Sequence, residues 1–394
     1  MFNFTATPPL SLYVHIPWCV RKCPYCDFNS HALKGDIPEQ AYVNALLADL
    51  EHDLPTVWGR TVDTVFIGGG TPSLFSPDAI DQLLCGIRAR ITLDPAAEIT
   101  LEANPGTVDR EHFHGFREAG VNRLSIGVQS FQSDLLEKIG RIHDGREAIR
   151  AAEAAHDTGF ENFNLDLMFG LPGQSSAQVN ADLHTAIDLE PAHISWYELT
   201  IEPNTWFHRH PPQRPDDDML WDMQATGQRV LGAHDFGRYE VSAYARPGKQ
   251  CRHNLNYWQF GDYLGIGAGA HGKITDAAQQ RILRTAKTRH PDRYLELAGQ
   301  DPCTSTATSL STHDAVLEYV MNALRLDDGF TREAFAANTG LPFSMTEGPV
   351  THALDDGLLV EQGTRLLASE RGQRYLNELL QYWMQEEPLD ARTC

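Results

Sequence analysis

Basic residues and long apolar runs are both scarce in this sequence of 394 residues. It holds 32 lysines and arginines against 53 aspartates and glutamates, a formal net charge of −21. Such an acidic surface repels phosphate backbones, so nucleic acid is not an expected partner. Charge or glycine interrupts every apolar run well short of the ~20 residues that span a bilayer. The first residues, MFNFTATPPLSLYVHIPW, lack the basic flank and cleavage site of a secretory signal, and we expect a soluble, cytoplasmic protein.

Cysteine is also sparse, and its distribution is uneven. The chain has seven cysteines, and three of them, Cys19, Cys23 and Cys26, fall within eight positions. An odd number with one tight group indicates metal binding in a reducing compartment rather than a disulfide framework. The scattered Cys85, Cys303 and Cys394 are interpreted as ordinary thiols without a functional role. Hydrophobic residues at 42% and charged residues at 22% indicate a folded globular protein.

Short β-branched segments alternate with longer segments of helical spacing through the first half of the chain. Helical segments such as Tyr42–Leu54, Ile80–Ile91 and Arg146–His156 separate the predicted strands. The strands are Leu12–Ile16, Thr64–Gly68, Glu98–Glu102, Arg123–Val128, Asn162–Met168 and His193–Thr200. The alternation predicts an α/β fold in which helices cover a parallel sheet, and we expect a partial (β/α)6 barrel.

The tail differs in kind from the barrel region. Residues 309–394 contain three predicted helices, a β-hairpin around Gly363 and a last helix to Trp383, an order similar to a winged-helix module. Few basic residues occupy this segment, which argues for a lid or docking domain rather than a DNA-binding one. We therefore expect a barrel domain over 1–245, a connecting region over 246–308 and a winged-helix-like domain over 309–394. Length alone favours two or more domains.

The cysteine loop follows the first predicted strand. Three thiolates can hold three corners of a 4Fe-4S cluster and leave the fourth iron free for another ligand. A zinc site completed by His15 or a distant cysteine is the main alternative, but no second Cys-x-x-Cys arm is present. A thioredoxin-like role fits poorly because that fold's helix start is missing. In a barrel the carboxyl ends of the strands form one site. The second to fifth predicted strands bring glycines, Glu102, Gln129 and Asp166 to that end, beside the cysteine loop.

These motifs resemble a known family. The cysteine loop is similar to the radical S-adenosylmethionine (SAM) signature. The segments LYVHIPWC, GGGTPS, EANPGT, NRLSIGVQSF and NLDLMFGLP resemble the oxygen-independent coproporphyrinogen III oxidase family, over nearly the whole chain, and within it a haem-chaperone branch. The resemblance implies a radical SAM barrel, a 4Fe-4S cluster held by the three cysteines, and SAM as its exchangeable ligand.

The resemblance also implies roles for single residues. Tyr13 and Tyr25 are expected beside SAM, the backbone of Gly69, Gly70 and Thr71 at its amino group, and Glu102 at its ribose. Gln129, Arg141 and Asp166 are also expected to be cofactor-binding residues that contact a SAM molecule. Taken without the resemblance, the glycines are as well explained by a tight turn. Asp166 alone could equally be a buried structural carboxylate.

Two departures separate the chain from the oxidases that it resembles. Phe28 stands where the oxidase has a further cysteine, and only 18 residues precede Cys19, where the oxidase has a longer segment. The segment His253-Asn-Leu-Asn-Tyr-Trp resembles the His-Asn-x-x-Tyr-Trp motif of the chaperone branch, which implies His253 as an axial haem ligand. By itself a histidine there is more often a hydrogen-bonding residue. Cys251 and His271 are secondary candidates, and the glycine-rich run before His271 would let backbone approach the ligand or would form a plain buried turn.

Three functions are compatible with these motifs. The favoured one is a haem chaperone that binds haem and transfers it to an acceptor protein, without coproporphyrinogen oxidase activity. Oxidative decarboxylation of coproporphyrinogen III is the alternative, and a radical methyltransferase is the third. The expected cofactors are the cluster, SAM and haem. The resemblance further implies an electron donor such as flavodoxin or ferredoxin, and transient contact with membrane respiratory proteins.

Overall fold

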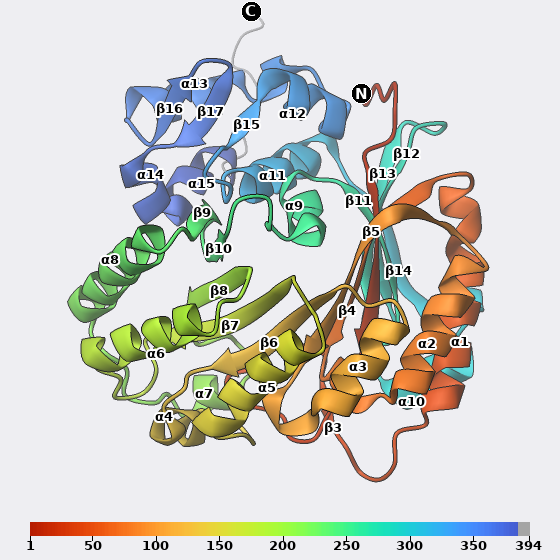
Figure 1. Cartoon of the computed structure of the whole chain (residues 1–394). Helices are drawn as coiled ribbons and strands as arrows, with labels where there is room; N and C mark the ends of the chain where they lie inside the picture. Colours follow the sequence, from red (N-terminus) through yellow and green to blue (C-terminus); the bar gives the residue numbers. More distant parts are fainter. Residues whose placement is uncertain (385–394) are drawn as a thin grey trace, which may run out of the picture.

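One mixed sheet runs through the first 310 residues of the computed structural model, which describes residues 1–384 (Figure 1). In spatial order its strands are β14 (Thr304–Ser309), β13 (Arg281–Lys287), β12 (His271–Asp276), β11 (Asp262–Ile266), β1 (Leu10–Ile16), β4 (Thr61–Gly69), β5 (Thr92–Ala103), β6 (Arg123–Gln129), β7 (Phe163–Phe169), β8 (His193–Glu198), β10 (Ala243–Ala245) and β9 (Gly237–Glu240). A separate pair, β2 (Trp18–Cys19) and β3 (His31–Ala32), brackets the cysteine loop.

Six parallel neighbours, β1, β4, β5, β6, β7 and β8, form the half-barrel that the sequence predicts. Each predicted strand coincides with one of them to within a few residues, so the α/β partial-barrel prediction is confirmed. Figure 1 shows the crossover helices following one another along the outside of the curved sheet. They are α1 (Glu39–Asp53), α2 (Pro77–Arg88), α3 (Arg110–Glu118), α5 (Gly145–Asp157), α6 (Ser176–Asp188) and α8 (Asp217–Ala233). Two short helices, α4 (Ser133–Lys138) and α7 (Trp206–Arg209), pack instead around Tyr25 of the cysteine loop.

Local chemistry explains where these helices begin and which face they bury. In α2 the Ser76 hydroxyl caps the helix by accepting from the Ala79 N–H, and Pro77 occupies the first turn. Its buried residues recur at three- and four-residue intervals, and four of them are large aliphatics with no exposure. Each contributes about 1.5–3 kcal/mol by leaving water. The same spacing in α1 and α5 holds those helices on the sheet.

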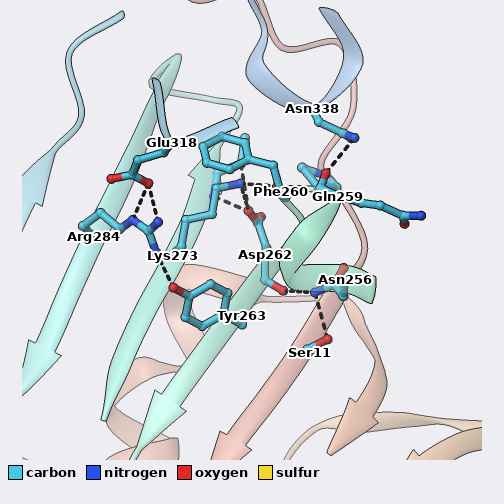
Figure 2. A network of polar contacts seen from close by, with 12 residues as sticks. Ser11, Asn256, Gln259, Phe260, Asp262, Tyr263, Lys273, Arg284, Glu318 and Asn338 are labelled. Carbon is cyan, nitrogen blue, oxygen red and sulfur yellow. Dashed lines mark hydrogen bonds and ion pairs between the residues drawn. The ribbon is translucent and has the colours of Figure 1, made fainter. Parts of the chain in front are cut away.

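The segment 246–308 adds strands to the sheet on the other side of β1. It holds α9 (Arg252–Trp258) and α10 (Pro291–Leu297); β11 pairs with β1 in parallel, and β12, β13 and β14 continue antiparallel. Buried charges tie this extension together. Figure 2 shows Asp262 accepting from the Lys273 ammonium at 3.1 Å and Lys273 also donating to the Phe260 carbonyl at 2.7 Å. Arg60 donates to the other Asp262 oxygen at 2.7 Å.

The C-terminal domain has a hydrophobic core of its own. Its elements are α11 (Thr312–Ala323), β15 (Phe330–Thr331), α12 (Arg332–Thr339), α13 (Glu347–Asp355), β16 (Leu359–Gln362), β17 (Arg365–Ala368), α14 (Glu370–Arg374) and α15 (Leu376–Met384). Three helices, α11, α12 and α13, precede the β16–β17 hairpin, and the sheet has the order β15, β17, β16. This arrangement confirms the winged-helix-like prediction. Phe4 from the N-terminal segment packs into this core. Cys394 and the end of the predicted third domain lie outside the described residues.

No helix within residues 1–384 is both long and apolar enough to cross a membrane.

Candidate functional site

A hollow of about 480 Å³ opens at the carboxyl ends of the half-barrel strands. We call it the cysteine hollow, because Cys19, Cys23 and Cys26 line it together with eight of the ten predicted cofactor-binding residues. Those eight are Tyr25, Gly69, Gly70, Thr71, Glu102, Gln129, Arg141 and Asp166. Residues from five neighbouring strand ends and one loop therefore meet in one place, as parallel strand ends do in barrels. Tyr13 and His253 lie elsewhere.

Cys19 is the last residue of β2, and Cys23 and Cys26 follow on the short loop between β2 and β3. A turn closes it where the Cys26 N–H donates to the Cys23 carbonyl at 3.2 Å, and the Ser30 hydroxyl lies 3.7 Å from the Cys26 sulfur. Burial raises the pKa of the Cys19 and Cys26 thiols, and the charge of the nearby Cys23 raises both further. Three thiolates held this close are costly without positive charge, and a metal cluster supplies it.

The donor set fits a cluster better than a single ion. Among residues 1–384, no three His, Cys, Asp or Glu side chains converge closely enough to bind one metal ion. A zinc ion would draw its thiolates to about 2.3 Å from one centre, whereas an iron-sulfur cubane is larger and holds each cysteine at a separate corner. Beside them the Arg141 guanidinium lies 3.8 Å from the Cys23 sulfur. This cation favours a ligand set with net negative charge.

The glycine turn after β4 lies tightly against the cysteine loop. Gly69 has φ +114°, and a Cβ there would come 2.5 Å from the His15 ring. A Cβ on Gly70 would come 2.5 Å from the Trp18 carbonyl oxygen. The N–H groups of Gly70 and Thr71 donate to β1 and the loop, to the Ile16 and Trp18 carbonyls respectively. The turn is thus required for packing. The Thr71 carbonyl accepts from the Leu74 N–H at 3.0 Å, and the carbonyl oxygens of Gly69 and Gly70 are candidates to accept hydrogen bonds from a ligand amine.

Two carboxylates, Glu102 and Asp166, lie on the floor of the cysteine hollow. Burial and, secondarily, the charge of Asp166 raise the pKa of Glu102 to about 7, although its Oε2 accepts from the Gly69 N–H at 3.0 Å. Burial also raises the pKa of Asp166, which accepts from Asn164 at 2.8 Å and Ser125 at 3.1 Å. Neither carboxylate has an ion-pair partner of its own among the described residues, which suits acceptors for ligand hydroxyl groups.

The opposite wall of the hollow is polar and strained. Gln129 has a left-handed backbone with φ 68°, and its side-chain oxygen accepts from the Tyr197 hydroxyl at 2.8 Å. Arg141 also donates to the Gly127 carbonyl, which aims its guanidinium toward the cysteines. Tyr25 packs beside Tyr197, and burial raises its pKa. A non-glycine residue with positive φ is uncommon and frequently marks a functional site.

A second hollow of about 470 Å³ adjoins the first across Asp27, Phe28, Gly69 and Glu102, which line both. We call it the tyrosine hollow, because Tyr13, Tyr257 and Tyr263 line it. The Tyr13 hydroxyl lies 3.0 Å from His15 Nδ1, and His15 Nε2 lies 2.9 Å from the Asn29 carbonyl oxygen. Tyr13 is therefore next to the predicted SAM residues but faces the adjoining space.

His253 is placed in the interior, on α9. It is 1% exposed, and its Nδ1 lies 2.8 Å from the Thr64 hydroxyl on β4. Nε2 is enclosed by protein and has no hydrogen-bond partner among the described residues. Burial lowers the pKa of His253 to about 3, so the ring is neutral. As an axial ligand it would require α9 to move, and that role stays a prediction.

Two neighbours of the motif have structural roles in this conformation. Cys251 is fully buried, and burial raises its pKa to about 11, which keeps the thiol protonated and a weak ligand. The glycine-rich run is a buried turn: a Cβ on Gly267 would come 2.4 Å from the His15 carbonyl oxygen. Sequence reasoning missed Ser125, Ser195 and Tyr197 in the cysteine hollow. They lie inside predicted strands, where a polar residue that faces a site has the same local pattern as one that faces a buried hydrogen-bond partner.

Comparisons with known proteins agree with this geometry. The model of the radical SAM superfamily matches residues 13–186, and the model of the HemN C-terminal domain matches residues 310–375. The half-barrel with a three-cysteine loop thus defines a radical SAM protein, a class that uses a 4Fe-4S cluster and SAM.

Full-length relatives narrow the class. The chain is 52% identical to the heme chaperone HemW of Escherichia coli over 96% of this chain and 99% of the relative. It is 33% identical to the heme chaperone HemW of Bacillus subtilis over 94% of this chain and all of the relative. The chain belongs to the HemW family. The solved coproporphyrinogen III oxidase HemN of E. coli has the same fold, with TM-score 0.81 at 22% identity, over 96% of this chain and 90% of that one.

Proposed function

We propose that this chain is a haem chaperone, which binds haem and passes it to an acceptor protein while holding a SAM-liganded 4Fe-4S cluster. The observation that carries the proposal is the pair of adjoining hollows. The cysteine hollow gathers the three cysteines, the Arg141 guanidinium and the buried carboxylates of Glu102 and Asp166, and the tyrosine hollow gathers aromatic side chains and the imidazoles of His15 and His271. The HemW relatives support it, since they carry the name of heme chaperones.

Cys19, Cys23 and Cys26 are the proposed cluster ligands. These three cysteines would hold the cluster and leave one iron for SAM as a further ligand, and the cluster would supply the electron that SAM chemistry needs. Arg141, beside Cys23, offsets the negative charge of the thiolates. The cysteine hollow therefore binds a charged cofactor with side chains already in place.

The remaining residues of the hollow are proposed to bind SAM. The carbonyls of Gly69 and Gly70, next to Thr71, suit its amino group, because the amides of this turn are largely used within the protein. Glu102 suits the ribose, and Tyr25, Gln129 and Asp166 are proposed to contact other parts of the SAM molecule. Tyr13 lines the adjoining tyrosine hollow and is proposed to contact SAM past Gly69 and Glu102, which line both hollows.

Two histidines are candidates for the haem ligand, His253 and His271. The His-Asn-x-x-Tyr-Trp motif favours His253, which then needs an opened α9. His271 lies at the start of β12 on the tyrosine hollow and is exposed. The further proposed partners are a reduced flavodoxin or ferredoxin as electron donor, the haem acceptor, and membrane respiratory proteins in transient contact. Three thiols in one loop need a reducing compartment, which supports the cytoplasm as the location.

Coproporphyrinogen III oxidation is the second candidate function, favoured by the fold shared with HemN. Phe28 argues against it, because an exposed phenyl ring stands where the oxidase has a cysteine. We therefore expect no conversion of coproporphyrinogen III by the protein supplied with reductant and SAM. Turnover on the order of one per second, typical of enzymes, would make the oxidase the better assignment.

Anaerobic reconstitution and haem titration test the chaperone proposal. The wild-type protein should bind about four irons per chain with a broad absorption near 400 nm. Cys23→Ala should lose that absorption, while Cys85→Ala, an exposed cysteine on α2, should keep it. The reconstituted protein should then bind haem and release it to an apo-acceptor. A protein that takes up no haem, or that holds stoichiometric zinc in place of iron, contradicts the proposal.

A further inference from the structure

Asp166 on the floor of the cysteine hollow is held by a residue of its own strand. Asn164 lies two positions earlier on β7, so the two side chains face the same side of the sheet. The Asn164 amide nitrogen donates to Asp166 Oδ1 at 2.8 Å and to the Ser125 hydroxyl at 2.8 Å. That hydroxyl donates in turn to Asp166 Oδ2 at 3.1 Å. Each oxygen of the carboxylate therefore accepts a hydrogen bond from the protein.

The Asn164 amide is buried and uses its full hydrogen-bonding capacity. Asn164 is 1% exposed, and its side-chain oxygen lies 2.6 Å from His193 Nδ1 and accepts from the Ser195 hydroxyl at 3.0 Å. The opposite orientation of the amide would place its oxygen against the Asp166 carboxylate, and a buried contact between two acceptors is unfavourable. The amide nitrogen therefore lies toward Asp166, and His193 Nδ1 carries the proton that the amide oxygen accepts.

The far side of the His193 ring fixes the same orientation. His193 Nε2 lies 2.8 Å from the Tyr239 hydroxyl, and the Cys251 N–H donates to that hydroxyl oxygen at 3.2 Å. A backbone N–H can only donate, so the Tyr239 hydroxyl proton is left to point at His193 Nε2, which must then be unprotonated. Burial and, secondarily, the charge of Arg123 lower the pKa of His193, in agreement with a neutral ring. The single proton of that ring is therefore on Nδ1.

These contacts form one chain of donors that ends on Asp166, which we call the aspartate chain. It runs from the Cys251 N–H through Tyr239, His193 and Asn164 to the carboxylate. Hydrogen bonds that point the same way polarise and strengthen one another in a protein interior. Burial raises the pKa of Asp166, and the hydrogen bond from Asn164 acts against that rise. The aspartate chain thus favours an ionised carboxylate in the cysteine hollow.

Two other charges act on Asp166. Arg123 on β6 favours the ionised carboxylate, but less than the hydrogen bonds from Asn164 and Ser125 do. The charge of Asp166 raises the pKa of Glu102, so the two acids of the hollow compete for ionisation. The hydrogen-bond partners of Asp166, with the chain behind them, are therefore the main groups that keep it ionised.

We propose that His193 is a positioning residue for Asp166: it holds the Asn164 amide in the orientation that keeps the carboxylate ionised and directed into the cysteine hollow. His193 itself lines neither hollow. An ionised Asp166 suits a ligand that donates hydrogen bonds or carries positive charge, and SAM has ribose hydroxyls, an amine and a sulfonium cation. The inference rests on the proposed SAM site and adds to it a residue outside that site.

SAM binding to the full-length, anaerobically cluster-loaded protein tests this role. His193→Leu removes the donor, so the Asn164 amide is free to turn. The cluster absorption should stay normal, and SAM affinity should fall by about 10-fold, which is the worth of one hydrogen bond that supports an ionised group. His193→Asn, whose amide can donate from near the position of Nδ1, should recover most of the affinity. His114→Leu, an exposed histidine on α3, is the matched control and should bind SAM as wild type does.

A double-mutant cycle with Asp166→Asn separates positioning from packing. Without a carboxylate to ionise, His193→Leu should weaken SAM binding no further, so the double variant should match Asp166→Asn alone. Additive losses would show that His193 acts by packing between the strands. Wild-type affinity in Asp166→Asn removes Asp166 from the proposed SAM site. Wild-type affinity in His193→Leu beside a weakened Asp166→Asn overturns the positioning role alone.

The His193 ring gives an independent readout of the direction of the chain. NMR of the cluster-loaded protein, isotope-labelled in histidine, should show a neutral His193 ring with its proton on Nδ1. The signals of His193 are identified by their absence in His193→Asn. A proton on Nε2 would reverse the aspartate chain and contradict the proposal.

Discussion

Glu102 offers a test of the cysteine hollow that needs neither haem nor turnover. Its pKa is raised from an ordinary 4.5 to about 7, first by burial and then by Asp166. A group whose folded-state pKa is raised above its unfolded value stabilises the fold while it is protonated. That stability is fully present below pH 4.5 and is lost as the pH rises through 7. Glu102→Gln keeps the shape of the protonated side chain and cannot ionise.

The size of the effect follows from the two pKa values. A tenfold change in a proton equilibrium is worth about 1.4 kcal/mol, so the full loss is at most about 3 kcal/mol. About 2 kcal/mol of it falls between about pH 5.5 and pH 8, because the unfolded chain is already ionised at the lower limit. Water reaches the carboxyl from the hollow and lowers the figure, and we expect the gap between variant and wild type to widen by about 1–2 kcal/mol.

Urea unfolding of the anaerobic, cluster-loaded proteins at several pH values measures this gap. The free energy of unfolding of wild type should fall with rising pH relative to that of Glu102→Gln. Glu118→Gln, an exposed acid on α3, is the control and should follow wild type at every pH. Parallel pH profiles for wild type and Glu102→Gln would refute the burial argument. They would show that the carboxyl is solvated and that the floor of the hollow is not closed by protein.

Two further substitutions probe the loop and the sheet extension. Gly70→Ala places a Cβ 2.5 Å from the Trp18 carbonyl oxygen, so we expect the substitution to displace the cysteine loop. The reconstituted variant should therefore lose the cluster absorption near 400 nm. Gly232→Ala is the control and should retain this absorption, because a Cβ at Gly232 has no atom within 4 Å. Asp262→Asn leaves the buried Lys273 and the largely buried Arg60 without their carboxylate and should lower the free energy of unfolding by about 3–5 kcal/mol. Asp276→Asn, at the sheet edge with a side chain 23% exposed, should cost under about 1 kcal/mol. Equal costs for the two aspartates would contradict the buried-pair argument.

The barrel and most of its site were predictable because their signals are local. Near-continuous hydrophobic strands such as Leu12–Ile16 have no other use than a sheet covered on both faces. Since parallel strand ends meet at one edge, residues at those ends, Glu102 and Asp166 among them, fall together whatever the details of the helices. The carboxyl ends of the strands thus predict a shared hollow, and the structure places eight of ten cofactor candidates there.

The sheet extension and the burial of His253 were not predictable in the same way. Strands β12 and β13 carry Lys273 and Lys287, which read as solvent-facing yet are 1% exposed. Their burial depends on acids distant in sequence, Asp262 for one and Asp49 for the other, and no local pattern reveals such pairs. His253 is similar, because its partner Thr64 lies on β4, far earlier in the chain. The motif predicts a haem ligand, and His253 is buried against Thr64 in this conformation, so that role stays a prediction.

The position of β1 explains why the two hollows adjoin. β1 is the first strand of the half-barrel, where it pairs with β4. On its other side it pairs with β11, the first strand of the sheet extension. The cysteine loop leaves the end of β1 and must therefore border both parts. Asn29 fixes it there, since its side chain donates to the Ala268 carbonyl at 2.8 Å and to the Arg289 carbonyl at 2.9 Å. One short segment thus joins the three cysteines to Arg289, which lines the tyrosine hollow, and a change in that loop reaches both hollows at once.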